Sequence, residues 1–198
     1  MKQLTKIVAL SALIFGGLAS ASASSLLSLT QSPSATLVGV GGNTPSTTSA
    51  FTENYLTFVF ADPNNALCAN CLDFVYVFAN QGPGDIEHIS MSNFGSYATE
   101  VGVSTINPNV SPLDFTESNG TITFDFTGND DLFGNETSSQ LVIETNAVNF
   151  QAGAITISDP SASVTVAGFQ PIPEPATFTL LGTGLLGAVG VIRRKFAA

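Results

Sequence analysis

The chain has 198 residues, of which 15 are Asp or Glu and only five are Lys or Arg, so its formal net charge is −10. All five bases lie at the two ends, and the chain has no Lys or Arg between Lys6 and Arg193. A domain without these side chains cannot neutralise a phosphate backbone, which excludes nucleic-acid binding. The length fits one domain with additional segments.

The N-terminal segment has the three parts of a secretory signal peptide. Lys2 and Lys6 precede an apolar run over residues 7–18, and alternating Ala and Ser fill residues 19–23. This order predicts a signal peptide over residues 1–23, cut by signal peptidase after Ala21 or Ala23, with Ala23 favoured. The alternative is a short buried helix.

Residues 24–170 are expected to form one all-β domain. Short runs rich in β-branched and aromatic residues alternate with turn residues, which favours an antiparallel β-sandwich. Asn119-Gly120, directly before a clean alternating run, predicts a β-hairpin. The expected strands cover residues 37–40, 55–61, 72–79, 86–91, 99–104, 121–127, 141–145, 154–158 and 163–166.

Cys68 and Cys71 are the only cysteines and lie between two expected strands. A structural disulfide is the favoured interpretation, because exported proteins fold in an oxidising compartment. A thioredoxin-type redox centre is an alternative, but it needs a low-pKa thiol at the start of a helix. A zinc site is the third interpretation, although such sites use four Cys or His ligands and the chain has one His.

His88 is that one histidine, and a catalytic role would pair it with Glu87. Adjacent strand residues point to opposite faces, so the two side chains are expected to stay apart and His88 to face solvent. Two carboxylates can also catalyse hydrolysis, but no pair stands out among the acids.

The segment 128–136 concentrates oxygen-bearing side chains. It is expected to be either a solvated turn or a Ca²⁺ site, because Ca²⁺ prefers oxygen ligands. The spacing does not match an EF-hand loop. The candidate ligands are Asn129, Asp130, Asp131, Asn135 and Glu136.

Sugar-binding sandwiches usually stack sugar rings on exposed aromatic side chains. The chain has no Trp and three Tyr, and pairs such as Phe58 with Phe60 and Phe124 with Phe126 are expected in the core. This composition weakens a carbohydrate-binding function without excluding it.

The C-terminal segment, residues 171–198, is a second ordered signal. Pro173-Glu174-Pro175 precede an uncharged run over residues 176–192, which ends at Arg193-Arg194-Lys195. As a helix this run would be about 25 Å long, marginal for a bilayer core of about 30 Å. The basic cluster would hold the C-terminus in the cytoplasm, so a single transmembrane helix is expected. An ordinary tail anchor is the alternative, and a GPI signal fits the basic end less well.

This tail resembles the PEP-CTERM sorting signal of exported proteins from Gram-negative bacteria that make exopolysaccharide. The resemblance rests on Pro173, Glu174 and Pro175, on the span 176–192, and on Arg193, Arg194 and Lys195. It implies an exosortase-type enzyme as processing partner and a transient anchor in the inner membrane. The domain resembles, more loosely, β-domains that precede such signals, in the stretches 74–80, 141–147 and 166–169.

These features predict a non-enzymatic exported protein of the cell surface or extracellular matrix, associated with exopolysaccharide or biofilm. Two other functions stay open. A carbohydrate-binding module of the matrix would be retained on the producer's own polysaccharide. A secreted enzyme using acidic residues would lose turnover when single carboxylates are changed. No cofactor is expected apart from the Ca²⁺ considered above.

Overall fold

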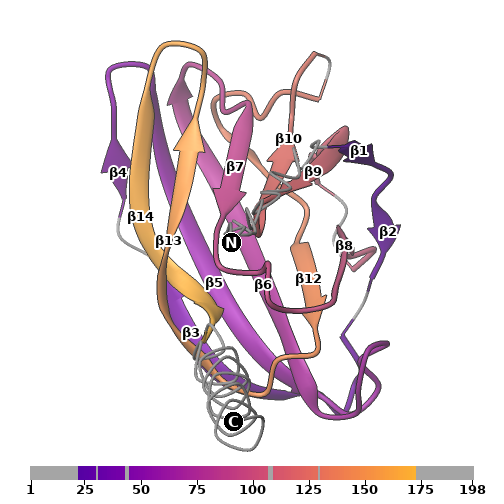
Figure 1. Ribbon diagram of the computed structural model, residues 1–198. Helices are drawn as coiled ribbons and strands as arrows, with labels where there is room; N and C mark the ends of the chain where they lie inside the picture. The colour runs from indigo at the N-terminus through magenta and orange to yellow at the C-terminus, as the bar shows by residue number, and fades with distance from the viewer. Residues whose placement is uncertain (1–21, 30, 43–44, 107–108, 129, 173–198) are drawn as a thin grey trace, which may run out of the picture.

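The computed structural model describes residues 22–29, 31–42, 45–106, 109–128 and 130–172, and every regular element in these ranges is a β-strand (Figure 1). Within them no helix is long and apolar enough to cross a membrane. The expected transmembrane span 176–192 and most of the expected signal peptide lie outside the described residues.

The strands form two sheets, called here the small sheet and the large sheet (Figure 1). The small sheet has the order β1 (Ser22–Ser24), β9 (Asp114–Ser118), β10 (Thr121–Asp125), β7 (His88–Met91), β13 (Phe150–Ser158) and β14 (Ser163–Pro171). The large sheet has the order β2 (Leu27–Ser28), β8 (Thr99–Val103), β12 (Leu141–Thr145), β6 (Cys71–Pro83), β5 (Phe51–Asp62) and β3 (Thr36–Gly42). Two short strands complete the large sheet, β11 (Glu136–Thr137) beside β6 and β4 (Ser46–Thr47) beside β5.

The two sheets enclose one shared core, as expected of a sandwich. Phe74, Tyr76 and Leu141 of the large sheet lie in the same buried cluster as Phe124 and Ile155 of the small sheet. Two pairings among the described residues depart from the expected antiparallel pattern, because β2 pairs with β8 in parallel and Val110 forms a parallel bridge with Ser138. The hydrophobic pattern fixes which face of a strand is buried, but it does not fix the direction of the neighbouring strand.

Each expected strand is present, but several strands were not expected. β9 has the sequence DFTES, whose single large apolar residue, Phe115, gives no detectable alternation. It is a strand because its residues pair with β10 on one side and β1 on the other. Residues 41–50 lie outside the expected strands, but they contain the end of β3 and all of β4.

The hairpin expected at Asn119-Gly120 joins β9 to β10. Ser118 pairs with Thr121 across a two-residue turn, and Asn119 and Gly120 have φ angles of 51° and 75°. Two successive residues with positive φ define the type I′ turn, which matches the twist of the strands that it joins.

β1 overlaps the last residues of the expected signal peptide. Cleavage after Ala21 would leave all of β1 attached, whereas cleavage after Ala23 would remove Ser22 and Ala23, two of the three residues that pair with β9. The expected cut after Ala21 would thus keep the pairing of β1 with β9 whole, and the expected cut after Ala23 would not.

One buried hydrogen bond connects the two sheets through the core. The hydroxyl of Tyr76 on β6 donates to the carbonyl oxygen of Phe169 on β14 at 2.8 Å, and Tyr76 is fully buried. Burial raises the pKa of Tyr76 far above its usual value, so the hydroxyl keeps its proton and always donates.

Changing Tyr76→Phe should lower the free energy of unfolding by about 1–2 kcal/mol, because the partly buried Phe169 carbonyl loses its donor. Urea unfolding at pH 7 measures this change. Tyr97→Phe is the matched control, because the Tyr97 hydroxyl donates to the carbonyl of Ile172 at a more exposed position where water can replace it. Equal losses for the two variants would show that burial does not set the cost.

Candidate functional site

The residues of the expected sorting signal, Pro173 to Lys195, lie outside the described residues. The described domain contains four places where polar or aromatic side chains gather: the disulfide loop, the loop 128–136, the outer face of the large sheet, and a cleft beside the β9–β10 turn.

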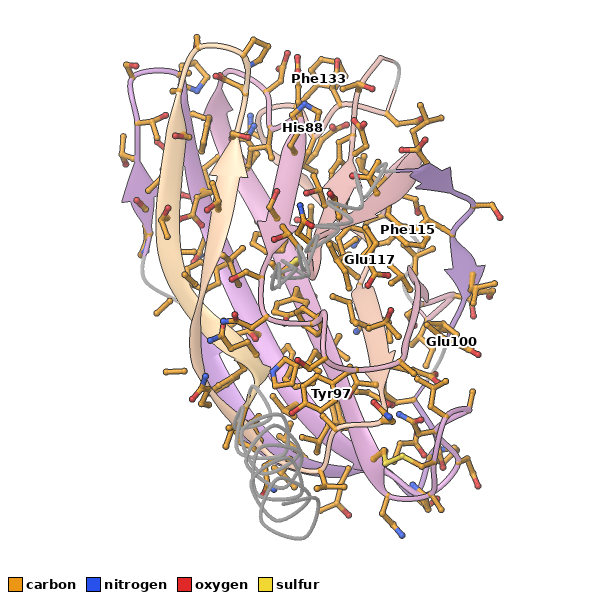
Figure 2. All side chains as sticks on the ribbon, viewed as in Figure 1. His88, Tyr97, Glu100, Phe115, Glu117 and Phe133 are labelled. Atoms are coloured by element: carbon orange, nitrogen blue, oxygen red, sulfur yellow. A yellow bond between two sulfur atoms is a disulfide. The ribbon has the colours of Figure 1, made fainter. Side chains whose placement is uncertain are left out.

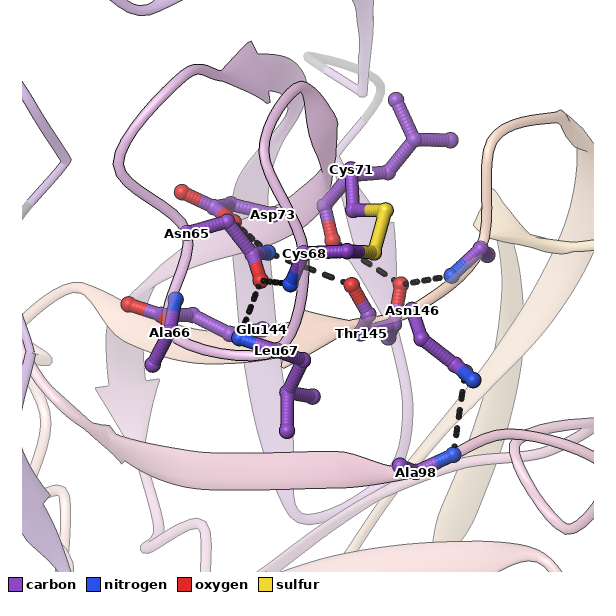
Figure 3. The surroundings of a disulfide bond; sticks show 12 residues. Asn65, Ala66, Leu67, Cys68, Cys71, Asp73, Ala98, Glu144, Thr145 and Asn146 are labelled. Carbon is purple, nitrogen blue, oxygen red and sulfur yellow. Dashed lines mark hydrogen bonds between the residues drawn. A yellow bond between two sulfur atoms is a disulfide. The ribbon is translucent and has the colours of Figure 1, made fainter.

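The disulfide loop, residues 63–70, connects β5 to β6. Cys68 and Cys71 form a disulfide in it (Figure 3). Asn65 holds the loop in shape, because its Oδ1 accepts hydrogen bonds from the backbone N–H groups of Leu67 at 2.8 Å and Cys68 at 3.2 Å. Its Nδ2 donates to Asp73 at 2.7 Å and to the Thr145 carbonyl at 3.2 Å, which attaches the loop to β6 and β12.

A row of acidic residues crosses the large sheet beneath this loop. Asp73 on β6 pairs with Glu144 on β12, which pairs in turn with Glu100 on β8. Asp73 and Glu144 are buried, as is Asp62 at the end of β5. Sequence periodicity does not reveal this row, because it depends on the register between three strands.

Backbone N–H groups stabilise two of these buried carboxylates. Asp62 accepts from the N–H groups of Ser32 at 2.6 Å and Asn64 at 2.8 Å, and Glu144 accepts from that of Ala66 at 3.0 Å. Asp73 has only the amide of Asn65, and its Oδ2 has no hydrogen-bond partner among the described residues. Asp73 is therefore the least stabilised charge in the row.

Burial raises the pKa of Asp73 to about 7, the Asn65 hydrogen bond opposes this, and the charges of Glu144 and Asp62 raise it further. Burial likewise raises the pKa of Glu144. A protonated Asp73 can donate to Asp62, which removes the unpaired charge. Asp73 has no exposed surface, so in this structure it cannot touch a substrate.

Glu53 on β5 is a fourth buried carboxyl group, and it lies on the core side of the large sheet. Its exposed fraction is 0%, and neither of its oxygens has a hydrogen-bond partner among the described residues. Burial raises its pKa to about 7. Glu53 and Asp73 thus both carry protons in the folded state at pH values where a free carboxyl would be ionised.

The loop 128–136 does not gather its acidic residues around one point. Glu136 Oε2 accepts the N–H of Phe133 at 2.9 Å, which closes a turn. Burial and the nearby carboxylate of Asp85 raise the pKa of Asp131. Among the described residues no group of three or more His, Cys, Asp or Glu side chains is placed to hold a metal ion. Asn129, one of the five candidate ligands, lies outside them.

His88 lies in the first position of β7 and its side chain is 38% exposed (Figure 2). The expectation that Glu87 points away from it was wrong. Glu87 precedes the strand, so strand alternation does not apply, and its carboxylate lies 3.9 Å from His88 Nε2. On the other side, His88 Nδ1 lies 3.4 Å from Asp125.

The outer face of the large sheet carries aromatic side chains that were expected in the core. Phe58 and Phe60 alternate with the fully buried Val59, so they point away from the core and are only half-buried. Their ring centroids are 6.3 Å apart. The exposed Leu56 and Val40 extend this apolar face. The apolar residues of the stretch 55–61 indicate a strand with two apolar faces. They do not indicate how much of each face other residues cover.

A polar cleft lies where the small sheet ends beside the β9–β10 turn. Met91, the last residue of β7, pairs with Ile122 of β10, so the residues after Met91 lie next to those before Ile122. Phe94 N–H donates to the Gly120 carbonyl at 2.9 Å and fixes the two loops together. The cavity between them has a volume of about 470 Å³. The sequence predicted the Asn119-Gly120 turn, but it did not predict that residues 92–96 lie beside this turn.

Stability should decrease as pH rises from 5 to 8. The folded-state pKa values of Glu53 and Asp73 lie near 7, above the usual values of 4.5 and 3.8, so the folded state binds protons more tightly. The cost of ionising each group appears as pH rises through this window, on the order of 2 kcal/mol per group. Urea unfolding at pH 5 and pH 8 measures it.

In the same experiment Glu53→Gln and Asp73→Asn should each reduce the difference in stability between pH 5 and pH 8. Glu100→Gln, at a half-exposed position of the same acidic row, is the control and should leave the difference almost unchanged. A difference between pH 5 and pH 8 that is as large in both variants as in the unchanged protein would show that these two groups do not cause it.

Replacing both Cys68 and Cys71 by Ser should cost about 2 kcal/mol or less and leave the fold intact. The bond closes a very short loop, which restricts the unfolded chain little, and Asn65 keeps the loop attached to β6 and β12 without it. Thermal unfolding of the oxidised protein and the double variant gives the difference. Loss of the folded state in the variant would contradict this prediction.

Comparison with protein-family models gives a match at the C-terminal end. Residues 171–195 match the family model described as the PEP-CTERM protein-sorting motif. No curated protein and no solved structure matches the chain significantly. The match begins at Pro171, the last residue of β14, so the motif follows the domain directly. The match therefore indicates an exported protein whose C-terminal PEP-CTERM motif is a signal for sorting by exosortase.

Proposed function

We propose that the protein is a non-enzymatic component of the cell surface or of the extracellular polysaccharide matrix of a Gram-negative bacterium. The observation that carries this proposal is the PEP-CTERM motif at residues 171–195, placed directly after the last strand of the domain. A domain that is delivered outward by its tail acts where polysaccharide is the surrounding polymer.

The charge of the domain supports a role at the outside of the cell. The described residues contain acids but no Lys or Arg. Such a domain is repelled by anionic lipid surfaces and by its own copies, which keeps it dispersed once the anchor is removed. The carbohydrate-binding alternative is favoured by one observation, the polar cleft beside Asn119 and Gly120.

A secreted enzyme that uses carboxylates is the remaining alternative. The buried acids Glu53 and Asp73 have raised pKa values, a property found at catalytic sites. Both have exposed fractions of 0%, however, which supports a structural role for them. Turnover of a polysaccharide that disappears on changing either carboxylate would favour the enzyme.

Protein recovered from outside the cells should lack every residue after about Pro175, because exosortase processing near Pro-Glu-Pro would release the domain. Intact mass of the extracellular protein measures both ends of the chain. Deleting Arg193–Lys195 should leave an uncut precursor in the membrane fraction, because the positive cluster that orients the tail is gone.

The matched control deletes residues 196–198 and keeps the basic cluster. This variant should be cut and exported like the unchanged protein. Full-length protein with residues 176–198 attached, found in the extracellular matrix, would contradict the proposal that the tail is a transient anchor.

A further inference from the structure

We infer that the cleft between residues 92–96 and 119–121 binds an uncharged sugar segment of the surrounding polysaccharide. This inference rests on the proposed matrix function and adds the site and the chemical class of the ligand.

The two loops that line the cleft meet so closely that no side chain would fit at their point of contact. A Cβ atom on Gly95 would lie 2.8 Å from the Cα of Gly120, so the two loops touch along their backbones. Asn93 and Asn119 both have positive φ, at 70° and 51°. Asparagine adopts this conformation more readily than most residues, so both loops can turn tightly beside the cleft.

The side chains around the cleft match the chemistry of a sugar. Two amides and three hydroxyls line it, and each of these groups can donate and accept hydrogen bonds, as vicinal sugar hydroxyls do. None of the five side chains is buried, and none has a hydrogen bond to another described residue, so all can serve a ligand. The five are Ser92, Asn93, Ser96, Asn119 and Thr121.

The size of the cleft and its lack of charged residues indicate a small, uncharged ligand. Its volume of about 470 Å³ lies within the range of about 300–1,000 Å³ that is usual for small-molecule sites. No lining residue is charged. The described domain has no Lys or Arg, so an anionic polymer would be repelled by the carboxylates without any compensating attraction. A neutral sugar meets no such barrier.

The outer face with Phe58 and Phe60 is the competing place for a sugar on this domain. That face offers apolar side chains and a smaller hollow of about 190 Å³ lined by Asn54, Leu56 and Thr137 among others. The cleft offers several convergent hydrogen-bonding groups, which fix the orientation of a polyol better than an apolar surface does. A sugar could bind at either place, so substitutions in the cleft and on the outer face are needed to tell which one binds it.

The test uses the full-length protein in mild detergent and native gels cast with a polysaccharide. The neutral probes are dextran, mannan and the neutral fraction of the producing cells' polysaccharide, and alginate is the anionic probe. Retardation by at least one neutral probe is expected. The double variant Asn93→Gly/Asn119→Gly removes both amides while glycine accepts both positive φ angles.

This double variant should bind at least about tenfold more weakly, since two hydrogen bonds to the ligand are lost. Asn135→Gly is the matched control, because Asn135 has a φ of 69° and lies outside the cleft. It should bind like the unchanged protein. Far-ultraviolet circular dichroism of all variants confirms that they are folded.

Three results would overturn the inference: retardation by no neutral probe, unchanged binding in the double variant, or loss of binding on Phe58→Ala instead. Retardation by alginate alone in the presence of Ca²⁺ would also overturn it. Cell fractionation distinguishes a wrong assignment of the cleft from a wrong matrix function, because it measures where the unchanged protein is found. Unchanged protein found in the matrix without neutral-sugar binding rejects only the cleft, whereas unchanged protein absent from surface and matrix rejects the matrix function.

Discussion

The folded domain must accommodate its carboxylates without any Lys or Arg, and this constraint shapes much of the structure. Backbone N–H groups stabilise Asp62 and Glu144, and the loop that provides some of these donors is the one that Asn65 and the disulfide hold in shape. Where no such donor is available, at Glu53 and Oδ2 of Asp73, burial raises the pKa and a proton removes the charge. The domain therefore uses backbone hydrogen bonds and protons where other proteins use ion pairs.

This constraint has a consequence for the surface as well. Because the described domain has no Lys or Arg, these side chains cannot attract an anionic polymer. It can recognise a partner through neutral hydrogen bonds, apolar contacts or a shared cation. The cleft beside the β9–β10 turn offers the first of these, and the outer face with Phe58 and Phe60 offers the second. The disulfide loop is occupied by its own structural contacts, with Asp73 closed off from solvent.

The fold was predictable wherever one strand carries its own signal. The alternating run of β10 and the Asn119-Gly120 turn were sufficient to predict the hairpin, and the apolar runs of β5, β6 and β12 were sufficient to predict interior strands of a sheet. β9 was missed because its pairing partners, rather than its own residues, make it a strand. Phe58 and Phe60 were misplaced because strand periodicity separates two faces but does not tell which of two apolar faces is covered. Glu87 was misjudged because β7 starts two residues later than expected, at His88.

The sequence by itself determined the sorting motif at residues 171–195, because such a signal is a linear order of residues that does not depend on the folded domain. It also determined the all-β class and the charge, because both depend on composition and local periodicity. Only the tertiary structure decided which acids are buried together, which aromatic residues face solvent, and that residues 92–96 meet residues 119–121 across a cleft. Those features depend on strand register and on the packing of the two sheets, which join residues far apart in the chain and leave no local pattern in the sequence.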